Sequence, residues 1–167
     1  HKVEASGAEI AEASDDELKK ASFLKHPQKV IAVLRQPQYT PDFEKKVTSS
    51  LCLGLDGVQD PGNLGTIVRL ADWFGIEDIF CSADTADIYN PKTVQATMGG
   101  LSHVRVHYID LYNALTSLKN NIPVYGTFLD GNAIYSEKLE QHGIIIMGNE
   151  GKGISPEIAG VVNNRLF

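Results

Sequence analysis

The stretch Ser50-Leu-Cys-Leu-Gly-Leu-Asp-Gly-Val-Gln-Asp-Pro-Gly-Asn-Leu-Gly-Thr-Ile-Val-Arg-Leu-Ala-Asp-Trp-Phe-Gly75 decides the class of fold. Its first residues, 50–55, form an apolar run that suits a buried strand, and a glycine-rich loop follows. Residues 63–74 then carry apolar side chains at helical spacing, with Asn63 as a candidate N-cap and Gly75 just past the helix end. The stretch therefore predicts a strand, a loop and a helix, in that order.

The same order repeats along the rest of the chain. Apolar runs suited to strands lie at residues 50–55, 78–81, 104–108, 122–127 and 144–147. Helical stretches lie between them, and capping signals mark their starts at Asn90-Pro91, Asp110 and Ser155-Pro156. Alternation of this kind predicts an α/β fold, in which a mostly parallel sheet has helices on both faces.

The segment before Ser50 follows a different pattern. Ser14-Asp-Asp-Glu17 is a capping box, which predicts a short helix that ends near Ser22. The apolar run at residues 29–35 predicts a strand, and the two prolines that follow it interrupt regular structure. We therefore place a boundary between this segment and the α/β domain.

The composition is that of one globular domain with a substantial core. Of the 167 residues, 43% are hydrophobic and 22% are charged, and no apolar run approaches the roughly 20 residues of a membrane-spanning helix. We expect a cytoplasmic protein.

Cys52 and Cys81 lie in short apolar runs without a nearby Cys or His, which favours buried, reduced thiols over a disulfide or a metal site. The net charge of −6 argues against bulk electrostatic binding of nucleic acid, so an RNA partner must be bound locally.

Two loops that follow strands carry the candidate functional residues, because open α/β sheets bind ligands beyond the carboxyl ends of their strands. The first loop leads into the helix that holds Asn63 and Arg69, six positions apart. Two helical residues at that spacing do not share a face, so they converge only if Asn63 lies in the loop. The alternative makes Asn63 a helix cap and Arg69 a solvated surface charge.

The second loop lies in Ile144-Ile-Ile-Met-Gly-Asn-Glu-Gly-Lys-Gly-Ile-Ser155, where three glycines interrupt a strand. Glycines let the backbone approach a ligand closely, which suits an adenine or a ribose; a purely structural turn is the alternative. The spacing matches neither a P-loop nor the Gly-x-Gly-x-x-Gly dinucleotide fingerprint.

Other candidate sites are weaker. His103 and His107 flank the strand at residues 104–106, but no third ligand is near in the sequence, so we predict a structural pair and no metal site. The Gly-x-Ser-x-Gly signature of a Ser/His/Asp hydrolase is absent.

Taken together, the two loops resemble the motifs of the SpoU-type, TrmH-like RNA ribose methyltransferases of the SPOUT superfamily. Gln59-Asp-Pro-Gly-Asn-Leu-Gly-Thr-Ile-Val-Arg69 resembles the first motif, and Met147-Gly-Asn-Glu-Gly-Lys-Gly-Ile-Ser155 resembles the second. Gln95-Ala-Thr-Met-Gly-Gly100 resembles the segment between them. The resemblance spans residues 50–167. It implies a trefoil-knotted fold, S-adenosylmethionine as cofactor, an RNA substrate, and a homodimer with its active site across the two-fold interface.

The resemblance also assigns roles to single residues. It implies catalytic roles for Asn63, Arg69 and Glu150. It places the cofactor pocket along Thr127, Met147, Gly148, Asn149 and Gly153. For a charged arginine, we prefer phosphate binding and stabilisation of developing alkoxide charge over a role as proton acceptor. Glu150 is expected to orient Arg69 or the Asn63 amide, and no metal or redox cofactor is called for.

The resemblance divides the chain into three parts. Residues 1–37 resemble the end of an N-terminal RNA-binding domain, 38–49 form a linker, and 50–167 form the methyltransferase domain. The N-terminal part favours rRNA over tRNA as the substrate. The family's third motif, which completes the knot and the pocket, is expected after Arg165-Leu-Phe167, so we expect the natural chain to continue past Phe167.

Two other functions stay open on the sequence alone. One is a non-catalytic RNA-binding domain that retains the fold, and the other is a small-molecule nucleotide-binding α/β protein. The basic residues nearest to the motifs are Arg69, Lys92, Lys152 and Arg165. Because they are few and the chain is acidic, we expect residues 50–167 to bind RNA weakly without the upstream domain.

Overall fold

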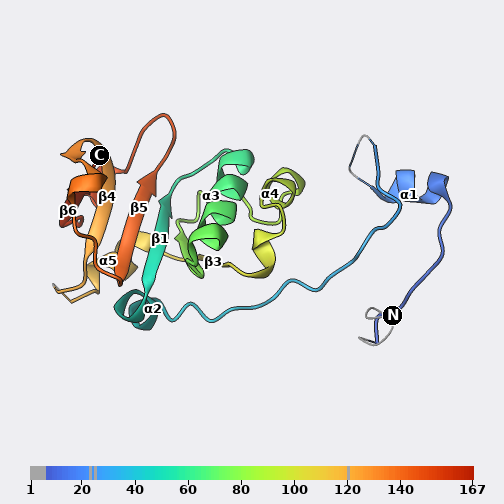
Figure 1. Cartoon of the computed structure of the whole chain (residues 1–167), viewed down its shortest axis with the longest axis horizontal. Helices are drawn as coiled ribbons and strands as arrows, with labels where there is room; N and C mark the ends of the chain where they lie inside the picture. Colours follow the sequence, from blue (N-terminus) through green and yellow to red (C-terminus); the bar gives the residue numbers. More distant parts are fainter. Residues whose placement is uncertain (1–6, 23, 25, 120) are drawn as a thin grey trace. The chain divides into compact units, whose positions relative to one another are not determined.

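The computed structural model describes residues 7–22, 24, 26–119 and 121–167 (Figure 1). The chain divides into two compact units, one that ends at Gln38 and one that runs from Tyr39 to Phe167. No helix in the described residues is both long and apolar enough to cross a lipid bilayer. The residues of the two motifs all belong to the second unit.

The first unit contains helix α1 Asp15–Ala21. Its predicted capping box is confirmed: the Ser14 backbone N–H donates to the Glu17 carboxylate at 2.8 Å, and the Glu17 N–H donates to the Ser14 hydroxyl. The strand predicted at residues 29–35 is wrong, because this segment has no regular structure and Val33 is 94% exposed. An apolar run becomes a stable strand only where a neighbouring strand takes up its backbone hydrogen bonds.

The second unit is built around a six-stranded sheet in the order β3-β2-β1-β5-β4-β6 (Figure 1). Its strands are β1 Leu51–Asp56, β2 Asp78–Cys81, β3 Arg105–Tyr108, β4 Val124–Asn132, β5 Gly143–Gly148 and β6 Asn164–Leu166. Its helices are α2 Phe43–Ser49, α3 Pro61–Phe74, α4 Pro91–Ala96, α5 Leu111–Thr116 and α6 Pro156–Ala159, with short 3-10 turns η2 Gly100–Ser102 and η3 Ile134–Ser136. Each pair of neighbouring strands is parallel, which confirms the predicted α/β class.

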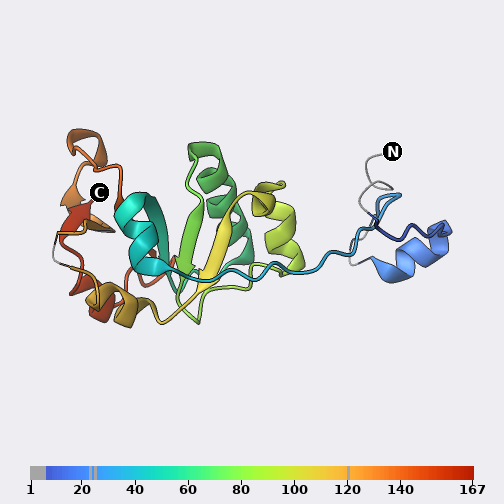
Figure 2. The same ribbon diagram turned by 90° about the horizontal axis from the view of Figure 1, so that it is seen from below.

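Helices cover both faces of this sheet, as predicted (Figure 2). Successive strand residues point to opposite faces, so Cys52 packs with α2, α5 and α6 while Leu53 packs against α3. Cys52 and Cys81 are both buried and free, one on each face. Burial raises the pKa of the Cys52 thiol to about 11 and that of Cys81 to about 12, so both stay protonated and unreactive.

Helix α3 begins earlier than the sequence predicted. Its N-cap is Asp60, whose carboxylate accepts a hydrogen bond from the Asn63 backbone N–H at 2.9 Å. Asn63 therefore lies inside the helix, and its prediction as the N-cap is wrong. Pro61 explains the earlier start, since proline suits the first helical position, where a backbone N–H has no partner. The predicted end is confirmed, because Gly75 adopts a left-handed φ of 71°.

Helix α2 lies within the residues for which we expected a linker. Phe43 and Val47 are buried in the core that α2 shares with α5 and α6. This helix is therefore part of the compact α/β unit, which begins at Tyr39. The RNA-binding role of residues 1–37 stays a prediction.

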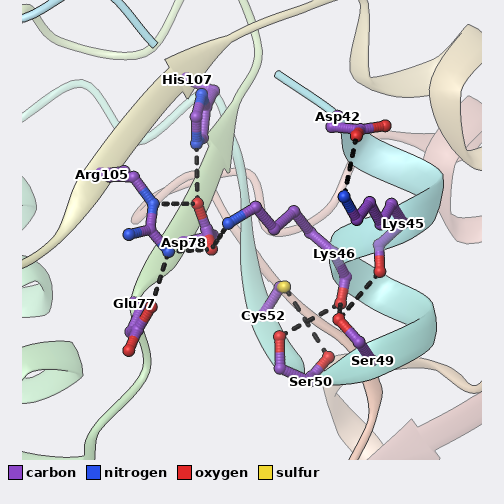
Figure 3. Close-up of polar contacts among 10 residues, drawn as sticks. All are labelled: Asp42, Lys45, Lys46, Ser49, Ser50, Cys52, Glu77, Asp78, Arg105 and His107. Atoms are coloured by element: carbon purple, nitrogen blue, oxygen red, sulfur yellow. Dashed lines mark hydrogen bonds and ion pairs between the residues drawn. The ribbon is translucent and has the colours of Figure 1, made fainter. Parts of the chain in front are cut away.

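A buried charge network joins α2 to strands β2 and β3 at the amino edge of the sheet (Figure 3). Asp78, whose side chain is 2% exposed, accepts hydrogen bonds from Arg105 at 2.7 and 2.8 Å. It also accepts one from His107 Nε2 at 2.9 Å, and Lys46 Nζ lies 3.1 Å away. Burial by itself would raise the pKa of Asp78, but these contacts outweigh it and hold the pKa well below its usual range.

His103, which precedes β3, and His107, which lies within β3, do not form a site together. His107 is buried against Asp78, whereas His103 is exposed and faces Asp72 at 3.0 Å. Within the described part of the chain, no group of three or more His, Cys, Asp or Glu residues could hold a metal ion.

Candidate functional site

Both candidate loops lie at the carboxyl edge of the sheet, where β1 and β5 run side by side. The register pairs Asp56, the last residue of β1, with Gly148, the last residue of β5. The loop after β1 leads into α3, and the loop after β5 carries Glu150. The two motifs therefore start from adjacent points, because the strand order places β5 next to β1.

The loop after β5 is a tight turn that requires its glycines. Backbone hydrogen bonds join Asn149 and Gly153 in both directions, at 2.8 and 2.9 Å. Gly153 has a φ of 72°, in the left-handed region that favours glycine. A β-carbon on Gly148 would lie 2.2 Å from the Gly153 carbonyl carbon, so no larger residue fits there without a shift of the backbone.

Asn149 links this loop to the loop after β1 by a hydrogen bond. Its Nδ2 donates to the Gly57 carbonyl at 2.8 Å, and its Oδ1 accepts from the Gly151 N–H at 2.9 Å. Asp56, which is 8% exposed, forms a second hydrogen bond between the two loops, because its carboxylate accepts from the Ser155 N–H at 2.6 Å. Asp56 was not among the predicted site residues, although a carboxylate at the end of an apolar strand is a signal that could have identified it.

The structure brings Asn63 and Glu150 together. Asn63 Nδ2 donates to Glu150 Oε1 at 3.0 Å, and the Asp60 backbone N–H donates to the same oxygen at 3.4 Å. Burial tends to raise the pKa of Glu150, but the hydrogen bonds from Asn63 and from backbone groups lower it below its usual range. Glu150 is therefore ionised at neutral pH. Its contact with the Asn63 NH2 group leaves the Asn63 Oδ1 as an acceptor.

Arg69 does not join this pair within one chain. Asn63 and Arg69 both belong to α3, where six residues correspond to about 9 Å along the axis and about 240° around it. Arg69 is exposed, and its side chain makes no hydrogen bond or ion pair with the residues that the structure describes. From the sequence, the side chains of Asn63 and Arg69 could converge only if Asn63 lay in a loop. Asn63 lies in the helix, so they do not converge.

The face of α3 that carries Arg69 also presents large apolar side chains. Leu70, Trp73 and Phe74 are 49%, 85% and 73% exposed. Trp73 lies one turn beyond Arg69, so the two side chains project from the same side of the helix. This face of α3 is therefore apolar and exposed in the single chain.

Three of the residues predicted to line the cofactor pocket lie on neighbouring strands at this edge. Met147 and Gly148 end β5, and Thr127 lies beside them in β4, where its hydroxyl donates to the Ile146 carbonyl at 3.2 Å. On its other side Thr127 faces Leu166 of β6. Their contact with a cofactor stays a prediction.

Lys92 of α4 adds a positive charge beside the first turn of α3. Its Nζ donates to Asp60 Oδ2 at 2.9 Å, and the two side chains are 62% and 44% exposed. The hydrogen bond from Lys92 is the main cause that lowers the pKa of Asp60. The sequence indicated Lys92 only as a basic residue near the motifs, because its partner lies 32 positions away.

Comparisons with known proteins match the motifs. Residues 50–166 match the SpoU rRNA Methylase family. The chain is 34% identical, over 97% of its length, to the 23S rRNA guanosine 2′-O-methyltransferase RlmP of Bacillus subtilis, and covers 64% of that protein. The structure of a TrmH-family RNA methyltransferase from Porphyromonas gingivalis is 38% identical, with a TM-score of 0.76 over 95% of this chain and 62% of that one. An AdoMet-bound rRNA methyltransferase from Sinorhizobium meliloti is 29% identical, with a TM-score of 0.63 over 71% of this chain and 46% of that one. The chain thus spans less than two thirds of the length of each of these relatives.

Proposed function

The chain belongs to the SpoU rRNA methylase family, and on that premise we propose that it transfers a methyl group from S-adenosylmethionine to a ribose 2′-hydroxyl of ribosomal RNA. Its relative RlmP is named as a 23S rRNA 2′-O-methyltransferase, and the Sinorhizobium structure as AdoMet-bound. The observation that carries the proposal is the contact of Asn63 with Glu150, which joins the two motifs at the carboxyl edge of the sheet. We also propose a cytoplasmic location, because the relative RlmP is a bacterial enzyme named for ribosomal RNA.

Asn63 and Glu150 are proposed to hold the reacting ribose. Ionised Glu150 fixes the Asn63 amide, so that the amide oxygen can accept a hydrogen bond from the 2′-hydroxyl. A hydroxyl held in this way can present an oxygen lone pair to the methyl group, and such positioning supplies a large part of the rate. A charged Arg69 would stabilise the alkoxide character that develops as the hydroxyl gives up its proton to solvent water.

The residues at the edge of β5 fit a nucleoside such as S-adenosylmethionine. Bound there, the cofactor supplies an electrophilic methyl group on a sulfonium. Gly151 and Gly153 are exposed, and the lack of side chains at these two positions leaves the backbone open to a flat ring. The exposed Thr127 and the partly buried Met147 give this edge one polar and one apolar neighbour.

The proposal includes a homodimer. Arg69 lies away from Asn63 and Glu150 in its own chain, on the helix face with Trp73 and Phe74. A two-fold contact through this face would cover the apolar side chains and bring Arg69 of one chain toward the Asn63–Glu150 pair of the other. The exposed apolar face supports this arrangement, since a monomer would leave it in water.

A methyl-transfer assay tests the proposal. The chain is incubated with tritiated S-adenosylmethionine and unmodified rRNA, and the RNA is digested to nucleosides. We expect label in a 2′-O-methylated nucleoside. Label on a base, or no transfer by a protein that binds S-adenosylmethionine in calorimetry, would contradict the proposal. RNA binding without any binding of S-adenosylmethionine would indicate the non-catalytic RNA-binding domain instead.

A further inference from the structure

We infer that Lys92 is a phosphate-binding residue of the proposed site, bonded to Asp60 in the free protein and to a phosphate oxygen of the RNA in the complex. The inference rests on the proposed function, because it concerns the RNA strand that presents its ribose to Asn63. It adds a residue that lies outside the two motifs, on α4.

Lys92 is connected to the Asn63–Glu150 pair through a single residue. Asp60 uses one carboxylate oxygen to cap α3 through the Asn63 N–H, at 2.9 Å, and the other to accept from Lys92 Nζ, also at 2.9 Å. The Asp60 backbone N–H donates to Glu150. Asp60 therefore contacts the Lys92 ammonium group and also both residues that are proposed to hold the ribose, Asn63 and Glu150.

The backbone of Lys92 is fixed in place relative to this pair. Asn90 caps α4 by accepting from the Lys92 N–H at 2.9 Å. The loop that leads to α4 is tied to the loop after β1, because the Gly57 N–H donates to the Ser82 hydroxyl at 2.9 Å. Lys92 is thus placed by the fold, while its side chain remains 62% exposed and accessible to a strand of RNA.

The chemistry of the substrate favours a cation at this position. In RNA the 3′-phosphate sits on the carbon next to the one that bears the 2′-hydroxyl, so a ribose held by Asn63 brings a phosphate to the same place. Asp60 and Glu150 are both ionised there and would repel it. Lys92 compensates for this charge, and Asp60 occupies only one of the three N–H donors of its ammonium group.

Two substitutions at this pair should change RNA affinity in opposite directions. Lys92→Ala removes the phosphate contact. Asp60→Asn keeps an oxygen that can cap α3, but removes a negative charge and frees Lys92. Lys45→Ala is the matched control. Lys45 is an exposed lysine on α2, the helix that precedes β1, and it lies next to an exposed aspartate, the N-cap residue Asp42.

The experiment measures the Kd of the full chain for a single-stranded RNA oligonucleotide of mixed sequence, by fluorescence anisotropy across a salt series. We expect Lys92→Ala to weaken binding about threefold to tenfold at low salt and to flatten the plot of log Kd against log salt by about 0.7. Asp60→Asn should tighten binding about twofold. Lys92→Arg, which keeps the charge, should restore the slope, and Lys45→Ala should match the wild type.

The outcomes separate this inference from the proposed function. An unchanged slope in Lys92→Ala, or a slope in Lys92→Arg as flat as in Lys92→Ala, overturns the inference even if the protein methylates RNA. A slope that flattens as expected supports the inference even if no methyl group is transferred, in which case the proposed function alone has failed.

Discussion

Replacing Asp78 by Asn should cost the protein much of its stability, although Asp78 lies at the edge of the sheet opposite to the candidate site. The Asp78 carboxylate is 2% exposed and accepts from Arg105, His107 and Lys46. Removing its charge leaves Lys46 without its counter-ion and leaves Arg105 with the exposed Glu77 alone. Breaking a buried ion pair in this way costs about 3 to 5 kcal/mol. Arg105 and Lys46 are 28% and 30% exposed and can turn partly to water, so we expect a loss of about 3 kcal/mol.

The measurement is the free energy of unfolding in urea, together with the melting temperature. For a chain of this length, a loss of about 3 kcal/mol corresponds to a fall in melting temperature of about 6 to 12 °C. Glu77→Gln is the matched control, because Glu77 bonds the same Arg105 guanidinium at 2.7 Å but is 69% exposed. It should cost less than about 1 kcal/mol. If the two variants lost equal stability, the reasoning from burial would be wrong.

The pH dependence follows from the direction of the Asp78 shift. The pKa of Asp78 in the folded chain lies below its unfolded value of about 3.8, so its contribution is fully present above that pH. The contribution is lost as the pH falls from about 3.8 through the folded pKa. The stability gap between the wild type and Asp78→Asn should therefore be constant near neutral pH and close in acid. A gap that closed on raising the pH instead would contradict this assignment.

Three further predictions concern the candidate site. Gly148→Ala should lower the unfolding free energy by about 1 to 3 kcal/mol, because its β-carbon would lie 2.2 Å from the Gly153 carbonyl carbon. Gly151→Ala, with 3.7 Å to its nearest neighbour, should be tolerated in the same urea titration. Arg69→Ala should abolish methyl transfer to rRNA while leaving the melting temperature unchanged, since Arg69 is exposed; transfer at the wild-type rate would place the site elsewhere. Trp73→Asp should convert a dimer to a monomer in sedimentation at micromolar concentration, and a wild type that is already monomeric would refute the proposed interface.

Local sequence patterns determined the class of fold because they report contacts between residues that are close along the chain. The apolar run at residues 50–55 predicted β1, and the apolar spacing of residues 63–74 together with Gly75 predicted α3. The cap at Asp110 was equally visible, since its carboxylate accepts from a backbone N–H three positions on. Strands that alternate with helices imply a parallel sheet. The loops after β1 and β5 each follow the carboxyl end of a strand, so they were expected at the carboxyl edge of that sheet.

The same local patterns failed where a structure depends on distant partners. Residues 29–35 have the composition of a strand but form none, because composition cannot show whether a neighbouring strand is available. Asn63 resembled a helix cap, but Asp60 and Pro61 start the helix one turn earlier.

Only the tertiary structure decided which residues of the site meet. Asn63 and Glu150 are 87 positions apart and touch because β1 and β5 are neighbours in the sheet, which no spacing in the sequence reveals. The geometry of α3 likewise separates Arg69 from Asn63, although both lie in one motif. The pairing of Lys92 with Asp60 depends in the same way on how two loops pack. Such contacts arise from the order of the strands and the packing of the loops between them, and these are properties of the folded chain rather than of any local stretch of sequence.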